Sequence, residues 1–194
     1  MSKERLLAFS DGVLAIVITI MVLELRAPHE ADARALWPIL PKFLSYVLSF
    51  VFLGIYWNNH HHLFQVVERV SGGVLWANLH LLFWLSLTPF VTAWMGENHF
   101  APFPVACYGG VLLLSGTAYF ILVRVLLGQH PRGSLLATAI GSDLKGKISV
   151  VVYALAIVLA WRRPLVACAL YVAVAVLWLV PDRRVEKALA LRAG

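Results

Sequence analysis

A short polar motif stands directly before a long apolar stretch near the start of the chain. Arg5, Ser10 and Asp11 place a cation, a hydroxyl and a carboxylate within about two helical turns, and the only hydroxyl in residues 12–25 is that of Thr19. Ionised side chains at the mouth of a membrane helix are costly in hydrocarbon, so they should pair inside the protein or reach the interface. A threonine oxygen in the helix can face a cation. This combination favours ion conduction over enzymatic chemistry.

Two further polar groups lie where later apolar stretches end and begin. The first holds three consecutive histidines, which point about 100° apart on a helix, whereas ligands that share a metal ion favour i, i+3 or i, i+4 spacing. We therefore expect no metal site and interpret the histidines as part of a polar network, with a proton-sensing role left open. The network residues are Asn58, His60, His61, His62, Asn78 and His80.

The composition of the chain indicates that these helices lie in a membrane and not in water. Apolar residues make up 61% of the chain, charged residues 13%, and the mean hydropathy is +0.81, which excludes an ordinary soluble domain. Breaks rich in Pro, Gly and charge divide the chain into six predicted spans, of which the last two are the shortest. We expect an all-α integral membrane protein with one domain over residues 1–194 and spans near 6–25, 43–64, 74–95, 103–127, 144–161 and 165–180.

The basic residues predict the orientation. Of the 16 Lys and Arg residues, eleven lie on the amino-terminal side of the membrane and five on the other. The positive-inside rule then places both termini in the cytoplasm. In that orientation the polar residues of the first three spans lie at one depth. We expect Asp11 to accept hydrogen bonds from Arg5, Asn78 or one of the histidines. No nucleic-acid-binding signature is present.

The first span has one notable face. Gly12, Ile16, Thr19 and Leu23 follow i, i+4, i+7, i+11 spacing, so they line one side of a helix. Packing core would explain such a stripe in an isolated helix, and a threonine hydroxyl often bonds a carbonyl one turn back. The chain lacks a Thr-Val-Gly-Tyr-Gly filter, a ring of acids within the spans and a broken helix for a carried substrate. A pore would therefore require one helix repeated around a symmetry axis.

The run from Arg5 through Phe9, Ser10 and Asp11 into Gly12, together with Tyr56, Trp57 and the histidines, resembles the bacterial branch of the transmembrane protein 175 potassium channel family. The resemblance covers the six-span layout and is most specific in the first helix. It implies a potassium-favouring cation channel of the cell membrane, with the lipid bilayer and the permeant potassium ion as partners and no cofactor. Animal members carry two six-span units per chain, so one unit here implies a homotetramer.

The resemblance also implies residue roles. The family's hydrophobic constriction falls on Ile16, with a further apolar ring on Leu23, and its hydroxyl ring falls on Thr19. The family motif held here by Arg5, Phe9, Ser10 and Asp11 is expected to hold the pore helix against its neighbours.

Other functional classes remain as alternatives. A secondary transporter would show inverted repeats, which the sequence does not display, and a proton-conducting membrane protein or a membrane scaffold would also fit the composition. An enzyme is the least favoured class, because the spans hold no nucleophile with a base in reach, no His-Glu-x-x-His motif and no acidic metal cluster.

Overall fold

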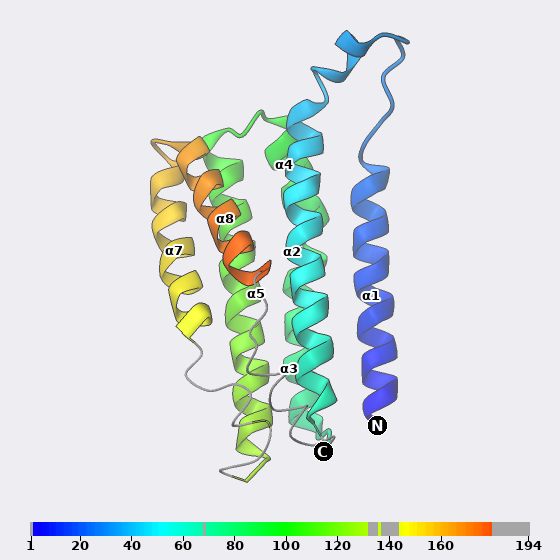
Figure 1. Ribbon diagram of the computed structural model, residues 1–194, viewed down its shortest axis with the longest axis vertical. Coiled ribbons are helices and arrows are strands. Elements are labelled where there is room, and N and C mark those ends of the chain that lie inside the picture. The colour runs from blue at the N-terminus through cyan, green and yellow to red at the C-terminus, as the bar shows by residue number, and fades with distance from the viewer. Residues whose placement is uncertain (1, 68, 132–135, 137–143, 180–194) are drawn as a thin grey trace.

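Every regular element of the computed structural model is helical over the residues that it describes, which are 2–67, 69–131, 136 and 144–179. Figure 1 shows the long helices side by side in one bundle, with α1 at one edge and α7 at the other. The predicted all-helical membrane fold with six spans is therefore confirmed. The elements are α1 (Lys3–Leu23), the 3₁₀ helix η1 (Ala33–Leu36), α2 (Leu40–Gln65), α3 (Gly72–Ser86), α4 (Thr88–Glu97), α5 (Pro102–Gly128), α7 (Leu144–Ala160) and α8 (Pro164–Leu179).

Four stretches are long and apolar enough to cross a membrane: α1, α2, the pair α3 and α4 taken together over Gly72–Glu97, and α5. The helices α7 and α8 are shorter, with 17 and 16 residues. At about 1.5 Å per residue they cover about 25 Å, slightly less than the hydrocarbon core of about 30 Å. This agrees with the prediction that the last two spans are the shortest.

The third span differs from its prediction in one respect. We expected an uninterrupted helix near residues 74–95, but the helix breaks at Leu87 and restarts as α4. Pro89 lies in the first turn of α4, where it donates no backbone hydrogen bond and its ring crowds the preceding turn. The span is therefore two helical pieces in series.

Local sequence signals set the helix ends. The Ser2 hydroxyl accepts a hydrogen bond from the Arg5 amide at 3.4 Å, and the Ser71 hydroxyl accepts one from the Val74 amide at 3.4 Å. The chain reverses between α4 and α5 through His99 and Phe100, which both have positive φ. The expected tight turn at residues 162–164 joins α7 to α8, and Pro164 is the first residue of α8.

Two apolar clusters hold the bundle together. One packs α1 against α2, α3 and the end of α5, with Leu6, Leu53 and Leu122 fully buried. The other packs α2 and α4 against α5, α7 and α8 around the buried rings of Tyr108 and Tyr171. We call the end where α1 begins, α2 ends and α3 begins the amino-terminal end of the bundle.

Some predictions fall on residues outside this description. Val180, at the end of the sixth predicted span, is one of them, as are Arg132, Arg183, Arg184, Lys187 and Arg192, which contribute to the predicted orientation. The single-domain prediction for residues 1–194 likewise extends past the described part.

Candidate functional site

Helix α1 has two faces of different character. Leu6, Ser10, Leu14, Val17 and Met21 are buried against α2, α3 and α4. The opposite face is exposed along its whole length, including 61% of Ile16 and 73% of Leu23. We call this face the α1 stripe; its members are Arg5, Phe9, Gly12, Ile16, Thr19 and Leu23. Among the described helices of one subunit, none covers the residues for which a pore role is predicted.

The stripe is not a uniform apolar surface of the kind that faces lipid. Arg5 adds a charge and Thr19 a hydroxyl. A Cβ added at Gly12 would meet no atom within 4 Å, so packing within the subunit does not require glycine there. Small and polar residues on an exposed membrane face are typical of helix contacts and water-filled paths, because lipid offers them no partner.

The Thr19 hydroxyl points its hydrogen back into its own helix. Its Oγ1 donates to the carbonyl oxygen of Ala15 at 2.8 Å. This bond uses the only hydrogen of the hydroxyl, so the lone pairs of the oxygen remain on the exposed stripe. Oxygen lone pairs with no hydrogen directed outward can face a cation.

The partner predicted for Asp11 is wrong. Its Oδ1 accepts a hydrogen bond from the indole Nε1 of Trp57 at 3.0 Å, and not from Arg5, Asn78 or a histidine. The Trp57 ring also stacks on the His61 ring, with centroids 6.0 Å apart. An aromatic side chain thus joins α1 to α2 near this end of the bundle. The predicted depth of these residues in the membrane did not indicate this contact.

A second link runs through the buried side of the same bundle end. The Nδ2 of Asn78 donates to Ser10 Oγ at 2.9 Å, and its Oδ1 is 2.8 Å from His60 Nε2. Ser10 in turn donates to the carbonyl oxygen of Leu6 at 2.9 Å. All three linked side chains are buried. Because they come from α1, α2 and α3, this hydrogen-bonded chain fixes the rotation of α1 about its axis.

The remaining members of the predicted network lie apart from Asn78. His61 and His62 both interact with the Gln65 side chain, at 3.0 and 3.5 Å. His80 Nε2 accepts a hydrogen bond from Trp84 Nε1 within α3, and Asn58 is exposed. Among the described residues, no three His, Cys, Asp or Glu side chains gather as they would around a metal ion.

One further polar group, which was not predicted, lies in the other half of the bundle. Ser49 Oγ lies 2.6 Å from Thr92 Oγ1 and 3.0 Å from the Tyr108 hydroxyl, so it joins α2, α4 and α5. Scattered hydroxyls within apolar runs were the only signal, and their common location depends on helix rotation.

The motif residues therefore divide into two pairs. Ser10 and Asp11 bond α1 to α3 and α2 within the subunit. Arg5 and Phe9 lie on the exposed stripe, with 52% of Phe9 accessible.

The family model described as endosomal/lysosomal potassium channel TMEM175 matches residues 5–89, which cover most of α1, all of α2 and α3 and the start of α4. A potassium channel of Chryseobacterium sp. (strain P1-3) is 54% identical over 189 residues, covering 97% of this chain and 98% of that protein. The chain belongs to the TMEM175 family. Membership places it among ion channels and not enzymes.

Two other TMEM175 relatives add to this picture. The crystal structure of a lysosomal potassium-selective channel TMEM175 homolog from Chamaesiphon minutus superposes with a TM-score of 0.78 at 24% identity, over 92% of this chain and 96% of that one. This match shows a shared fold. The human endosomal/lysosomal proton channel TMEM175 is 39% identical over 83 residues, which are 37% of this chain and 16% of that protein.

Proposed function

We propose that this chain forms a potassium-favouring cation channel of the cell membrane, with both termini in the cytoplasm. Four copies assemble around a central pore lined by α1. Potassium is the permeant ion, and no cofactor takes part. The observation that carries the proposal is the α1 stripe, because α1, which lies in the part of the chain that the TMEM175 family model matches, packs one face into the subunit and leaves the other exposed.

The stripe supplies the elements of a pore. Rings of Ile16 and Leu23 would form hydrophobic constrictions, which exclude hydrated ions by dewetting until the pore widens. A ring of Thr19 hydroxyls between them would offer oxygen lone pairs to a passing cation. Arg5 and Phe9 on the same stripe would contact neighbouring subunits at the amino-terminal end. The name of the Chryseobacterium relative as a potassium channel supports potassium as the favoured ion.

A flux assay tests this proposal. Purified protein in liposomes is given a potassium gradient and then an equal sodium gradient, with wild type, Ile16→Asn and Val22→Asn compared. Wild type should favour potassium, and Ile16→Asn should raise leak because it wets the constriction. Val22 is exposed but lies about 100° around the helix from Leu23, so Val22→Asn should behave as wild type. Equal flux for all three proteins, with assembly intact, would contradict a pore along this stripe.

Proton conduction through the same pore is the second candidate. The observation that favours it is the name of the human relative as a proton channel. Adding a pH-sensitive dye to the same liposomes measures it directly. Proton flux that persists without a potassium gradient would support this candidate, and saturation of flux with ion concentration would instead indicate a transporter.

A further inference from the structure

A cavity of about 510 Å³ lies among α2, α5, α7 and α8, away from the α1 stripe. Figure 1 shows that the start of α7 and the end of α8 do not reach the amino-terminal end of the bundle, whereas α2 and α5 do. Lys147, near the start of α7, and Trp178, near the end of α8, line the cavity. Its volume falls within the roughly 300–1,000 Å³ typical of sites for small ligands. Its lining includes Phe52, Asn59, Lys147, Ser149, Val150 and Trp178.

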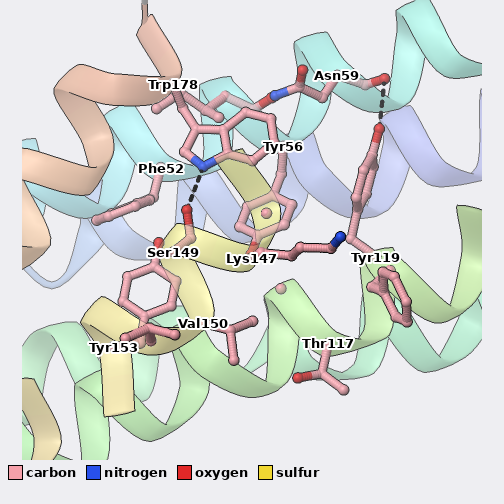
Figure 2. A pocket seen from close by; sticks show the side chains of 15 residues that line it. Phe52, Tyr56, Asn59, Thr117, Tyr119, Lys147, Ser149, Val150, Tyr153 and Trp178 are labelled. Carbon is pink, nitrogen blue, oxygen red and sulfur yellow. Dashed lines mark hydrogen bonds between the residues drawn. The ribbon is translucent and has the colours of Figure 1, made fainter. Parts of the chain in front are cut away.

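Several of the polar groups on its wall are already hydrogen-bonded within the protein. Trp178 Nε1 donates to Ser149 Oγ at 2.8 Å, and the Tyr119 hydroxyl donates to the carbonyl oxygen of Asn59 at 3.2 Å (Figure 2). The rings of Phe52 and Tyr153 lie 6.3 Å apart on another wall. A guest would therefore meet mostly aromatic and aliphatic surface, which favours an apolar chain over a polar solute.

Lys147 is the single cationic side chain that lines the cavity within the described part of the chain. Figure 2 shows its side chain extended between Tyr56 and Tyr119. It is exposed, and among the described residues it makes no hydrogen bond or ion pair, whereas Lys145 lies over the Trp178 ring at 6.0 Å. No described carboxylate lines the cavity. A lysine beside an apolar cavity in a membrane helix is stabilised by a counter-charge, and no described residue of the lining supplies one.

We propose that this cavity holds one acyl chain of an anionic phospholipid, with the headgroup phosphate paired to Lys147. The surrounding bilayer supplies such lipids at high concentration, and basic pockets between membrane helices recognise them in this way. The cation fixes the headgroup, and the apolar wall takes the chain. The lining comes from α2, α5, α7 and α8 and includes no residue of α1.

Native mass spectrometry tests the site. Purified protein in detergent is titrated with phosphatidylglycerol or, separately, phosphatidylcholine of the same chains, and lipid retained per subunit is counted. Wild type should retain more phosphatidylglycerol, and Lys147→Met should weaken its binding about fivefold, the ratio expected for one basic residue at a lipid headgroup. Val150→Trp, which fills the cavity from its wall, should lower retention of both lipids.

Two matched variants separate the site from the general surface. Arg69 is an exposed cation between α2 and α3 outside the lining, and Val158 is an exposed valine on α7 beyond it. Arg69→Met and Val158→Trp should retain lipid as wild type does. Equal retention of the two lipids, or no difference between Lys147→Met and Arg69→Met, would overturn the proposal. Because lipid is counted directly, a protein that conducts no ions still gives a decisive result.

Discussion

The indole of Trp57 donates a hydrogen bond to the carboxylate of Asp11 at 3.0 Å, and this contact joins α2 to α1 where the polar motif of α1 ends. The neighbouring residue of the motif, Ser10, is bonded to Asn78 of α3. Two adjacent residues of one helix thus reach two different helices. The rotation of α1 that exposes the stripe follows from these two bonds.

Removing the indole donor should loosen this contact. Trp57→Phe keeps an aromatic ring but leaves Asp11 without its donor, which should lower the free energy of unfolding by about 1 kcal/mol, since the pair is exposed. Thermal denaturation in detergent measures this change. Trp76→Phe is the control, because Trp76 is 76% exposed and its indole has no hydrogen bond among the described residues. Equal melting temperatures for the two variants would argue against a stabilising role for the Trp57 bond.

Breaking the buried chain should cost more. Asn78→Leu leaves Ser10 and His60 without their shared partner inside the bundle, which should lower the free energy of unfolding by roughly 1–3 kcal/mol. Unfolding by denaturing detergent provides the measurement. Asn58→Leu removes an exposed amide from the end of α2 and should change stability little.

Two adjacent glycines of α5 give a matched pair for packing. A Cβ at Gly109 would lie 2.8 Å from a Tyr171 ring carbon and 2.9 Å from Ile157 Cγ1, whereas a Cβ at Gly110 would meet nothing within 4 Å. Gly109→Ala should therefore force α8 outward and cost about 1–3 kcal/mol, and Gly110→Ala should be neutral or slightly stabilising. Melting curves of both proteins check this, and equal melting temperatures would contradict the packing argument, because helix propensity favours Ala over Gly at both positions.

The Thr19 hydroxyl should matter for ion preference and not for folding. Thr19→Ser keeps the oxygen, so the preference for potassium over sodium should persist, whereas Thr19→Val and Thr19→Ala should reduce it by about fivefold or less, the ratio for one weak oxygen contact. Reversal potentials in planar bilayers measure this preference. If Thr19→Val disrupts assembly and leaves the preference unchanged, Thr19 is a packing residue.

Disulfide trapping tests the assembly around α1. In a chain whose Cys107 and Cys168 are replaced by Ala, Ile16→Cys should form covalent dimers on oxidation in membranes, because four copies would meet near the pore axis. Leu14→Cys, which is 2% exposed within the subunit, should stay monomeric. Monomers from both variants, in protein that still conducts, would place Ile16 away from the axis.

The positions of the spans could be predicted because the length of the apolar runs decides them. Predicted limits of 103–127 and 144–161 agree with α5 and α7 to within one residue at each end. The break at Leu87 was foreseeable in principle, since Pro89 stands within an otherwise continuous run.

The polar contacts at the bundle end were only partly predictable. Orientation placed Asp11, His60 and Asn78 at one depth, and His60 does meet Asn78. Depth does not determine the angle at which each helix faces its neighbours, which depends on side-chain packing between helices. Asp11 therefore faces Trp57 in the structure, although several other donors lie at the same predicted depth in the membrane.

The connection between α1 and α2 differs from the tight turn between α7 and α8. The last residue of α1 is connected to α2 by the segment 24–39, which includes η1 and which Figure 1 shows arching above the bundle. That segment has enough length for α1 to slide by one helical turn, about 5.4 Å, without stretching any backbone. The position of α1 along the bundle therefore depends on its side-chain contacts. A shortened tether would remove that freedom and leave every contact of α1 in place.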